Sequence, residues 1–488
     1  MFKKVLVANR GEIAVRVMRA CKELGIPSVA VYSEADKQAV FALYADEAFY
    51  LGPAPSKDSY LNIDKILGIA SASGADAIHP GYGFLAENAQ FARACERSGI
   101  TFIGPRSETL DSMGSKIRAR EIMEKAGVPI LPGTGAISEP LAAAEAAREI
   151  GYPVLIKPAA GGGGIGMRVV EDRRELLGAI EHTQSTARSA FGDPTIFLEK
   201  YVRQPRHIEF QVLGDSYGDI VHLGERECSI QRRHQKVIEE SPSPIMTPQL
   251  KERMAAAALA AARAVNYVNA GTVEFIYSEG DFYFLEVNPR LQVEHGVTEI
   301  ITGVDIVQAQ IRIAAGEMLG LRQEEISQNG WAMECRVCAE DPLSNFTPSP
   351  GTIRGYRSPG GIGIRVDSGV HMGYPIPPYY DSLISKLLAY GRDRREVLER
   401  TRRALFEYVI LGVITNIPFL KAVVENVDFQ RGDYSTHFIE GHPELMADVE
   451  RIRNERSLGG IFAALKNNKS RAAISASVSA YLMEQERG

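Results

Sequence analysis

The chain has 488 residues, of which 45% are hydrophobic and 24% are charged, and its formal net charge is −6. This length predicts two to four domains with separate cores, and the negative charge argues against a nucleic-acid-binding protein, whose binding face would be basic. The longest apolar run, 254–262, is mostly alanine between Arg253 and Arg263, which predicts an alanine-rich helix of a soluble protein and no membrane span. The first ten residues have too few apolar positions for a signal peptide, which favours a cytoplasmic location.

Short apolar segments alternate with helical patterns through the first hundred residues. Segments 4–8, 28–32, 76–78 and 101–103 have the composition of short buried strands, and helical spacing of apolar residues follows the first of them. This alternation predicts a parallel sheet covered by helices. The turn after the first strand has one glycine and lacks the G-x-G-x-x-G fingerprint, so we expect a Rossmann-like domain that binds no dinucleotide.

The loop His79–Asn88 follows a predicted strand, at the edge where open α/β sheets place their ligands. Gly81 and Gly83 flank Tyr82 and allow the backbone to turn tightly there. Tyr82 is therefore a candidate ligand contact, although a tyrosine with a purely structural place in the turn explains the pattern equally well.

A glycine-rich loop follows a strand in the second region of the chain. The strand 153–157 ends in Lys157, and five of the six residues 161–166 are glycine before a further strand at 167–170. Successive backbone N–H groups of such a loop can surround phosphate oxygens, with the lysine as counter-charge. It is not a P-loop, since no G-K-[ST] follows, and a flexible hairpin tip is the alternative interpretation.

Two later segments carry candidate anion-binding side chains. Segment 207–213 alternates polar and apolar residues, which predicts a half-buried strand. In 226–236 the long donors Gln231, His234 and Lys236 could all bind anionic oxygens. A solvated run of surface charge is the alternative interpretation.

A predicted hairpin formed by 271–277 and 282–288 concentrates carboxylates at one end. A strand puts alternate side chains on one face, so Glu286 and Asn288 project together. A three-residue loop, or an equivalent bulge, places Glu274 directly opposite Glu286. Two facing carboxylates repel unless a cation lies between them, and Mg²⁺ prefers such oxygen ligands. The sequence therefore predicts a magnesium site, against the alternative of a solvated strand end.

From Trp331 onward the chain changes to short strands punctuated by glycine and proline, followed by a helical pattern at 396–408. This composition predicts an α+β region in which Arg336 is the main candidate for a site. Cys335 and Cys338 lack the further ligands of a zinc site, so we expect them to be ordinary buried thiols.

Five motifs, in order and at matching spacing, together resemble biotin carboxylase, the ATP-grasp component of biotin-dependent carboxylases. They are Asn9–Ala14, the loop His79–Asn88, the glycine loop, Gln231–Lys236 and Glu286–His295, and the resemblance covers about residues 1–440. It implies an α/β and α+β multidomain fold. Its parts are a Rossmann-like domain at 1–113, an ATP-grasp domain at 114–318 with a mobile lid at about 130–203, and an α+β C-terminal domain at 330–440. The extension 441–488 is polar and helical in pattern, with no implied role.

The resemblance implies a reaction in two steps. Bicarbonate attacks the terminal phosphate of ATP to give carboxyphosphate, and the CO₂ released from it is transferred to a ureido nitrogen of biotin. The implied ligands are ATP, two Mg²⁺ or Mn²⁺ ions, and biotin as a carrier-bound substrate. Such chemistry depends mainly on positioning and on neutralisation of charge.

The implied partners are a biotin carboxyl carrier protein and a separate carboxyltransferase, since no Met-Lys-Met biotin-attachment motif occurs in the sequence. A homodimer is also implied, without nucleic acid and without a membrane. The final carboxyl acceptor could be acetyl-CoA, propionyl-CoA or pyruvate, and the extension beyond residue 440 favours the two-subunit pyruvate type.

The resemblance further implies roles for individual residues. Those implied to hold metal ions are Glu274, Glu286 and Asn288. Those implied to contact ATP, besides Glu274 and Glu286, are Lys116, Lys157, Gly163, Gly164, Glu199, Lys200, Tyr201, Val202, His207, Gln231 and His234. Those implied for bicarbonate are Lys236, Arg290, Gln292 and Val293, with Glu294 as the base that deprotonates it. Tyr82 and Arg336 would meet biotin, and the implied catalytic residues are Arg290, Glu294, Lys236 and Arg336.

Two positions depart from the family pattern. Ile165 stands where the glycine loop usually has a basic residue, and Gly296 stands where proline usually follows Val-Glu-His. One alternative interpretation is another ATP-grasp ligase, such as an enzyme like carbamoyl-phosphate synthetase, in which Tyr82 and Arg336 would have no task. The other is an ATP-binding protein with impaired catalysis, against which the presence of every metal, phosphate and base residue argues.

Overall fold

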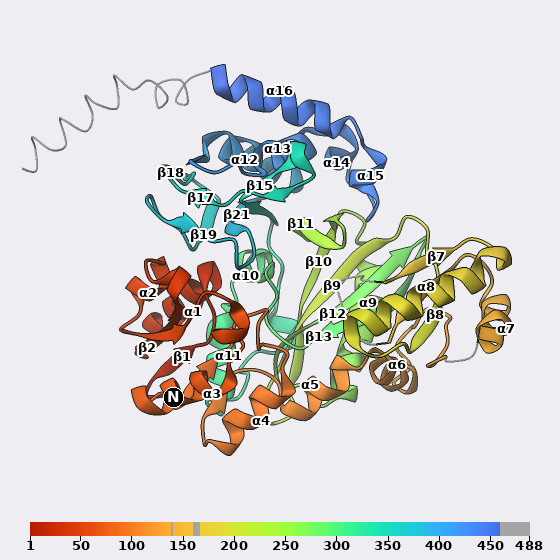
Figure 1. The fold of residues 1–488 in the computed structure, drawn as a ribbon, viewed down its shortest axis with the longest axis horizontal. Coiled ribbons are helices and arrows are strands. Elements are labelled where there is room, and N and C mark those ends of the chain that lie inside the picture. The colour runs from red at the N-terminus through yellow and green to blue at the C-terminus, as the bar shows by residue number, and fades with distance from the viewer. Residues whose placement is uncertain (138–139, 160–165, 459–488) are drawn as a thin grey trace, which may run out of the picture.

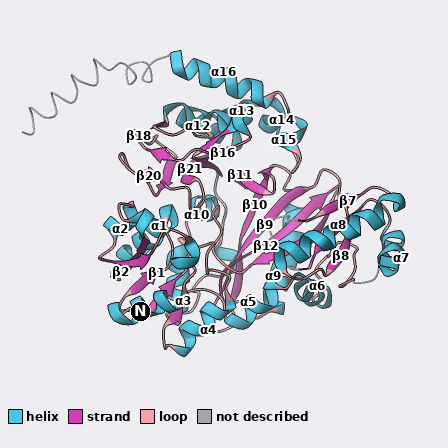
Figure 2. Cartoon of the chain, in the orientation of Figure 1, coloured by secondary structure: helices cyan, strands magenta, loops and turns pink. Residues whose placement is uncertain are grey.

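The computed structural model describes residues 1–137, 140–159 and 166–458. Figure 1 shows an N-terminal α/β layer, a large sheet at the centre, and a C-terminal region stacked beside both. Strands form the interior of each region, and helices lie mostly outside them (Figure 2). All of these regions contribute side chains to one cavity.

The N-terminal region is the parallel α/β domain that the sequence predicts. Its sheet has the order β3-β2-β1-β4-β5, and its pairings are parallel. The strands are β1 (Val5–Val7), β2 (Ser28–Ser33), β3 (Glu47–Gly52), β4 (Ala77–His79) and β5 (Thr101–Phe102). The helices are α1 (Gly11–Glu23), α2 (Val40–Tyr44), α3 (Ile63–Ser73) and α4 (Ala89–Arg97). Strand β3 was not predicted, because this edge strand alternates in burial and lacks the continuous apolar run of a buried parallel strand.

The central sheet has the order β13-β12-β9-β10-β11-β14-β21-β19. Its strands are β9 (Arg206–Gly214), β10 (Ile220–Arg232), β11 (Gln235–Ser241), β12 (Asn269–Ser278), β13 (Asp281–Asn288), β14 (Trp331–Cys338), β19 (Ile364–Ser368) and β21 (Leu383–Gly391). Because β11 pairs with β14, the sheet runs without a break into the C-terminal region. This continuity brings Arg336 of β14 next to side chains that lie about a hundred residues earlier in the sequence.

The prediction that 207–213 is a half-buried strand is wrong. Every residue of β9 is buried, and β12 and β10 pair with its two edges. Ile208, Phe210 and Val212 belong to the core that also contains helix α9 (Pro248–Ala264). His207 and Glu209 on the other face contact polar side chains of the site. The alternation of polar and apolar residues along β9 therefore reflects a buried polar face, whereas the prediction had this face exposed to solvent.

A small unit at one side of the central sheet, α7 to β8, has a core of its own and is called the lid below. Its sheet has the order β7-β6-β8. Its elements are α7 (Pro140–Ile150), β6 (Val154–Pro158), β7 (Arg168–Val170), α8 (Arg173–Phe191) and β8 (Ile196–Lys200). The predicted strands on either side of the glycine loop are thus confirmed. Gly163, Gly164 and the substitution Ile165 lie outside the described residues.

Further helices join and complete these regions. Two helix pairs connect them: α5 (Ser107–Gly114) with α6 (Lys116–Lys125) precedes the lid, and α10 (His295–Thr302) with α11 (Ile306–Ala314) lies between β13 and β14. The short strands of the C-terminal region are β15 (Glu340–Asp341), β16 (Thr347–Pro348), β17 (Gly351–Thr352), β18 (Gly355–Arg357), β20 (Pro375–Ile376) and β22 (Val409–Leu411). Its helices are α12 (Arg394–Glu407), α13 (Ile417–Glu425), α14 (Val427–Arg431), α15 (Phe438–Gly441) and α16 (Leu445–Leu458).

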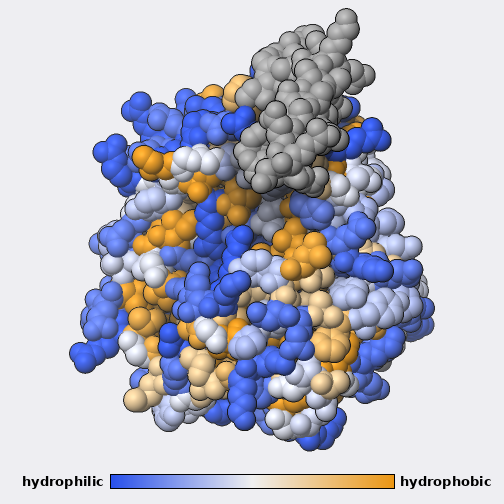
Figure 3. All heavy atoms as spheres, turned by 90° about the vertical axis from the view of Figure 1, so that its left-hand side faces the viewer, coloured by the Kyte–Doolittle hydropathy of each residue, from blue (hydrophilic) through white to orange (hydrophobic). Residues whose placement is uncertain are grey.

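Helix α16 confirms the helical pattern expected after residue 441, within the part of the chain that the structure describes. It packs against α13 through Leu445, Val449 and Ile452, all of which are buried. No helix among residues 1–137, 140–159 and 166–458 is long and apolar enough to span a membrane. On the face shown in Figure 3, apolar side chains lie scattered among hydrophilic ones.

Candidate active site

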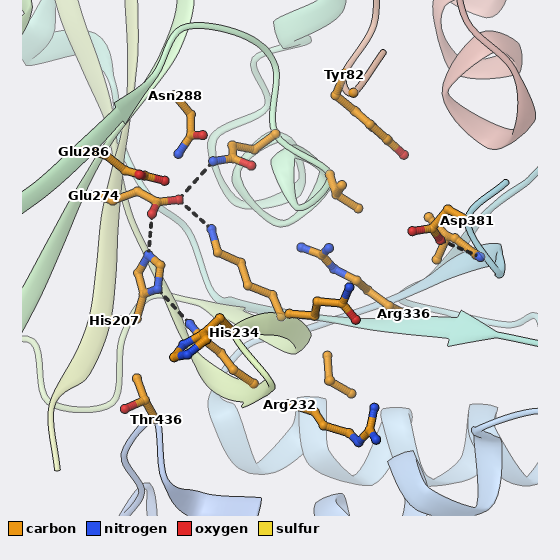
Figure 4. Close-up of a pocket in the computed structure, with 18 of the residues that line it drawn as sticks. Tyr82, His207, Arg232, His234, Glu274, Glu286, Asn288, Arg336, Asp381 and Thr436 are labelled. Atoms are coloured by element: carbon orange, nitrogen blue, oxygen red, sulfur yellow. Dashed lines mark hydrogen bonds and ion pairs between the residues drawn. The ribbon is translucent and has the colours of Figure 1, made fainter. Parts of the chain in front are cut away.

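One cavity of about 890 Å³ lies where the N-terminal region, the lid, the central sheet and the C-terminal region meet. Figure 4 shows carboxylates of the central sheet on one side, Tyr82 on the opposite side, and Arg336 reaching in between. The predicted site residues that line it are Tyr82, Lys116, Lys157, Lys200, Tyr201, Val202, His207, Gln231, His234, Lys236, Glu274, Glu286, Asn288, Arg290, Gln292, Val293 and Arg336. Glu199 and Glu294 do not line it, but each is buried and contacts a residue that does.

The hairpin of β12 and β13 brings two carboxylates face to face. Phe275 pairs with Phe284, but a bulge at Leu285 shifts the register by one residue, and Glu274 then pairs directly with Glu286. The connecting turn is one residue shorter than the predicted loop, and the bulge compensates for the difference. The predicted opposition of the two carboxylates is therefore confirmed through its bulged form.

Glu274 has cationic and hydrogen-bonding partners although it faces Glu286. Its Oε1 accepts from Lys236 Nζ at 2.8 Å and from Gln292 Nε2 at 3.1 Å, and its Oε2 lies 3.0 Å from His207 Nε2. Burial would raise the pKa of Glu274, but Lys236 and His207 lower this pKa far below its usual range. Glu274 is therefore ionised at neutral pH.

Glu286, unlike Glu274, lacks a paired cation among the described residues. Within the described part of the chain, its carboxylate makes no hydrogen bond or ion pair. Burial raises the pKa of Glu286, and the charge of Glu274 raises it further, although Lys116 opposes this. A divalent cation beside Glu286 and Asn288 would supply the positive charge that Glu286 lacks, and the side-chain oxygens of both residues are ligands that Mg²⁺ accepts. The residues present thus fit a magnesium ion.

Lys236 of β11 lies at the centre of a buried charge cluster. Its Nζ donates to Glu209 at 2.5 Å, to Glu274 at 2.8 Å and to Glu294 at 2.6 Å. Burial would lower the pKa of Lys236, but the three carboxylates raise this pKa well above its usual value. Lys236 is therefore a permanent cation in the wall of the cavity.

Glu209, which accepts from Lys236, and Arg226, which donates to Glu209, were not predicted from the sequence. Arg226 is fully buried, and its Nε donates to Glu209 at 2.5 Å. His207, Glu209 and Gln211 are polar residues at alternate positions of β9, a pattern that could have marked Glu209 as part of the site. Arg226 had no such signal, because it stands in a sequence that looks like surface charge.

Glu294 is fully buried, and both of its carboxylate oxygens face cations. Oε1 accepts from Lys236, and Oε2 accepts from Arg336 Nη2 at 2.9 Å. Burial would raise its pKa, but Lys236, Arg336 and Arg226 together lower this pKa well below its usual range. The carboxylate is ionised and can accept a proton, and its basicity would rise if one of the cations turned away from it.

Arg336 reaches the cavity from the C-terminal region. Besides Glu294, it contacts Glu239, whose Oε1 accepts from Arg336 Nε at 2.5 Å. Glu239 is another partner that sequence reasoning missed. Burial raises the pKa of Glu239 to about 7, although the charge of Arg336 opposes this. The guanidinium of Arg336 is thus held between two buried carboxyl groups, with its remaining surface toward the cavity.

Arg290 is fixed at the cavity wall by several acceptors. Its Nη2 donates to Asn288 Oδ1 at 3.1 Å and its Nη1 donates to Gln292 Oε1 at 2.9 Å. Its Nε donates to Glu87, which belongs to the predicted loop His79–Asn88 but had no predicted role. Arg290 therefore joins the end of β13 to the loop of the N-terminal region.

The residues predicted at the nucleotide end also make structural contacts. Lys157 Nζ donates to Glu199 at 2.5 Å, which explains why Glu199 lies behind the wall. Lys200 Nζ donates to two backbone carbonyl oxygens of the lid at 2.8 and 2.9 Å. Tyr201 Oη lies 3.2 Å from His437 Nε2, which joins the lid to the C-terminal region.

The motif Asn9–Ala14 holds the loop that carries Tyr82. Asn9 Nδ2 donates to the carbonyl oxygens of Pro80 and Tyr82, each at 2.7 Å, and Asn9 is buried. The hydroxyl of Tyr82 donates to Glu12. The position of Tyr82 is therefore set by the first helix and the turn before it.

Three family descriptions match the chain in sequence order. "Biotin carboxylase, N-terminal domain" matches residues 1–110, "Carbamoyl-phosphate synthase L chain, ATP binding domain" matches 115–322, and "Biotin carboxylase C-terminal domain" matches 334–441. The chain belongs to the biotin carboxylase family. Biotin carboxylases are ATP-dependent ligases, and this chain is an enzyme of that class.

Known biotin carboxylases are similar to the chain over most or all of its length. A pyruvate carboxylase subunit of Methanothermobacter thermautotrophicus is 58% identical over 100% of both chains. Biotin carboxylase 1 of Bacillus subtilis is 55% identical over 90% of this chain and 98% of its own. The crystal structure of the biotin carboxylase domain dimer of Hydrogenobacter thermophilus 2-oxoglutarate carboxylase, with MgADP, ADP and bicarbonate, matches with a TM-score of 0.88 and 52% identity, covering 91% of this chain and 99% of that chain. The predicted multidomain fold is thereby confirmed.

The flanking domains decide between the two ATP-grasp ligases that the sequence analysis left open. The central match is named after carbamoyl-phosphate synthase, but the matches on both sides of it are named after biotin carboxylase. These flanking regions contain Tyr82 and Arg336, the two residues that a carbamoyl-phosphate-type enzyme would not need.

Gly296, which departs from the family pattern, has a local reason in this chain. A Cβ atom at Gly296 would collide with Cδ2 of Leu388, which is fully buried in β21. We expect Gly296→Ala to lower the free energy of unfolding by about 1–3 kcal/mol, because the core must shift to admit the methyl group. Leu388→Ala in the same chain should relieve the collision, so the double variant should lose less stability than the sum of the single variants. Strictly additive losses in equilibrium unfolding would contradict this explanation.

Proposed function

We propose that the chain catalyses the ATP-dependent carboxylation of biotin on a separate carrier protein, with bicarbonate as the carboxyl donor. The observation that carries the proposal is one continuous cavity with three chemically different walls. Carboxylates suited to a metal–nucleotide lie on one side, and Tyr82 lies on the opposite side with Arg336 reaching in between. Lys236 and Arg290, which contact Glu274 and Asn288, form what is called the middle wall below. This arrangement lets a reactive intermediate pass from one wall to the next within a single cavity.

The nucleotide would lie at the lid side of the cavity. Lys116, Lys157 and His234 line this end and can donate to phosphate oxygens. Glu274, Glu286 and Asn288 would hold the Mg²⁺ ions, which neutralise phosphate charge when they are bound. The part played by the chain itself is to fix the terminal phosphate next to the middle wall.

Bicarbonate would bind in the middle of the cavity, near Arg290, Gln292 and Val293. In the first step, a bicarbonate oxygen bonds to the terminal phosphorus, the bond from that phosphorus to ADP breaks, and the bicarbonate proton passes to Glu294. Lys236 has a second role in this scheme. If its ammonium turns from Glu294 toward the arriving anion, the pKa of Glu294 rises, so the base becomes stronger when its substrate is present.

Biotin would bind on the side of Tyr82 and Arg336. In the second step, carboxyphosphate separates into CO₂ and phosphate, the released phosphate takes the proton of the biotin ureido nitrogen, and that nitrogen bonds to the carbon of CO₂. Negative charge develops on the ureido oxygen as that proton leaves. The guanidinium of Arg336 faces the cavity and can stabilise this charge, because it is already oriented by Glu239 and Glu294.

We further propose that the chain works as a homodimer with a carboxyltransferase that uses a 2-oxo acid, pyruvate in particular. The pyruvate carboxylase relative from Methanothermobacter thermautotrophicus aligns with 100% of this chain and therefore with the extension 441–488. Biotin carboxylase 1 reaches only 90% of this chain although 98% of its own length is aligned. Co-purification of the chain with its carboxyltransferase, followed by assay of pyruvate, acetyl-CoA and propionyl-CoA as acceptors, tests this proposal.

The central test of the proposed function is ATP cleavage by the purified chain with free biotin as the acceptor. We expect ADP release to depend on bicarbonate and to be stimulated by biotin, with carboxybiotin as the second product. ATP cleavage that proceeds equally well without bicarbonate and without biotin would contradict the proposal.

The proposed metal site predicts a specific effect of Glu286→Gln. We expect the Mg²⁺ concentration that gives half-maximal ATP cleavage to rise by about tenfold or more, because a carboxylate ligand is lost. The pKa of Glu286 is raised, so protons compete with Mg²⁺ for this carboxylate at a higher pH than they would for an ordinary glutamate. Acidification should therefore weaken Mg²⁺ activation of the natural chain. The effect should be smaller in Glu286→Gln, which has no carboxylate at this position to protonate. Glu279→Gln, an exposed change in the turn of the same hairpin, is the matched control. Equal Mg²⁺ titrations for all three proteins would refute the assignment.

A further inference from the structure

Lys386 of β21 is a fully buried cation beside the active site, and the reaction described above gives it no task. Its side chain is 0% exposed and does not line the cavity. β14 and β21 pair so that Arg336 lies directly opposite Lys386, and paired residues project from the same face of a sheet. Burying an ammonium group is unfavourable unless it is paired, so its partners indicate what it does.

One partner of Lys386 is the segment that carries the proposed base. Lys386 Nζ donates to the backbone carbonyl oxygen of Val293 at 2.7 Å. Val293 lines the cavity and immediately precedes Glu294. Since Arg336 holds the carboxylate of Glu294 at 2.9 Å, two neighbouring cations fix the same segment, one through its backbone and one through its side chain.

The other partner of Lys386 is Glu12, which belongs to the motif Asn9–Ala14. Lys386 Nζ lies 3.6 Å from Glu12 Oε2, and Glu12 Oε1 accepts from the hydroxyl of Tyr82. Burial raises the pKa of Glu12 to about 7, and Lys386 is the main charge that opposes a further rise. Lys386 therefore favours the ionised carboxylate that accepts from Tyr82.

The remaining acidic neighbours of Lys386 do not account for its burial. Asp367 pairs with Lys386 across β19 and β21, but its carboxylate is already held by Arg365 at 2.7 Å. Burial raises the pKa of Glu334 well above its usual range, which disfavours its ionised form, and among the described residues its carboxyl oxygens accept no hydrogen bond from Lys386. Among the residues that the structure describes, Glu12 and the carbonyl of Val293 are thus the direct partners of Lys386.

We propose that Lys386 is a positioning residue that couples the two substrate sides of the cavity, orienting Tyr82 through Glu12 and orienting Glu294 through the backbone of Val293. The inference rests on the proposed function, in which Tyr82 meets biotin and Glu294 meets bicarbonate. Neither of these two contacts joins Lys386 to the nucleotide end of the cavity. Loss of Lys386 should therefore impair biotin-dependent turnover, through both steps, while ATP binding is retained.

The test compares Lys386→Met, Glu12→Gln and the double variant in the full-length chain. We expect Lys386→Met to lower kcat for biotin-dependent turnover by about 10- to 100-fold, as removal of other supporting contacts of a site does, with the KM for ATP unchanged. Lys386→Met should also lower thermal stability, because Glu12 is left buried without its counter-charge. The double variant removes both charges and should regain stability without regaining turnover.

Recovery of turnover together with stability in the double variant would overturn the positioning role, because a merely structural role predicts that result. Arg394→Met is the matched control: it removes a largely buried cation paired with a glutamate, Glu240 at 2.7 Å, and neither residue lines the cavity. We expect it to lower stability without a selective loss of transfer to biotin. If the natural chain shows no biotin-dependent turnover, the proposed function fails, whereas normal turnover in Lys386→Met contradicts only the present inference.

Discussion

Replacing Arg290 by alanine is expected to lower the bicarbonate- and biotin-dependent rate of ATP cleavage by about 100- to 1,000-fold, the effect of removing one pre-organised donor from a developing negative charge. Arg290 lines the cavity, and its guanidinium is oriented by Asn288, Gln292 and Glu87. A planar guanidinium in this position can hold two oxygens of an anion at once, in both bicarbonate and carboxyphosphate. Steady-state assay of ADP release and carboxybiotin measures the loss.

Two further variants distinguish the effect of the geometry of Arg290 from the effect of its charge, and from the general effect of removing an arginine. Arg290→Lys keeps the charge but cannot reach Asn288 and Gln292 together, so we expect most of the loss to remain. Arg253→Ala changes an exposed arginine and should leave the rate unaltered. Thermal unfolding should show that Arg290→Ala still folds, since the side chain is at a cavity wall. Near-normal turnover in Arg290→Ala would remove this residue from the reaction.

Glu294→Gln is expected to lower the same rate by about 100- to 10,000-fold, because glutamine has nearly the same shape but cannot accept the bicarbonate proton. Lys236 keeps Glu209 and Glu274 as partners, and Arg336 keeps Glu239, so the variant should fold. ATP binding, measured by equilibrium titration, should be unchanged.

The pH dependence of kcat/KM provides a second test of Glu294. Lys236 and Arg336 overcome the effect of burial and hold the pKa of Glu294 well below its usual range, so Glu294 stays ionised in the free enzyme as the pH falls toward the usual glutamate range. The acid limb of kcat/KM, which reports the free enzyme, should therefore come from other groups and should keep its position in the variant. Glu299→Gln is a matched control, because it changes a buried, paired glutamate of helix α10 that does not line the cavity. An acid limb that moves with Glu294→Gln would contradict the low pKa, and a normal rate would contradict the role as a base.

Much of the fold follows from patterns confined to a few residues of the sequence. The parallel N-terminal sheet follows from short apolar runs that alternate with helical spacing. The opposition of Glu274 and Glu286 follows from the two-residue period of a strand and from the short connection between the two strands. Because two facing carboxylates repel unless a cation lies between them, this register also indicated a cation site. Such features are predictable because the residues involved are neighbours along the chain or across one hairpin.

Other features depended on strands that are far apart in the sequence. β11 and β14 are separated by almost ninety residues, and only their pairing in the folded sheet brings Lys236 and Arg336 to the same carboxylate, Glu294. Sequence patterns carried no sign that Arg226 is buried, since a charged residue is expected at the surface. β9 was misjudged for the same reason, because alternation of polar and apolar residues does not say whether the polar face meets solvent or a buried cluster.

By itself, the sequence determined which residue types are present and in what order: the carboxylates of the β12–β13 hairpin, the lysines and the Tyr82 loop, all within motifs of the biotin carboxylase family. Only the tertiary structure decided which charges neutralise one another. Lys236 is shared by three carboxylates, Glu286 makes no ion pair among the described residues, and Lys386 stands between Glu12 and Val293. The physical reason is that the energy of a charge depends on its burial and on neighbours within a few ångströms, and the folded sheet sets both.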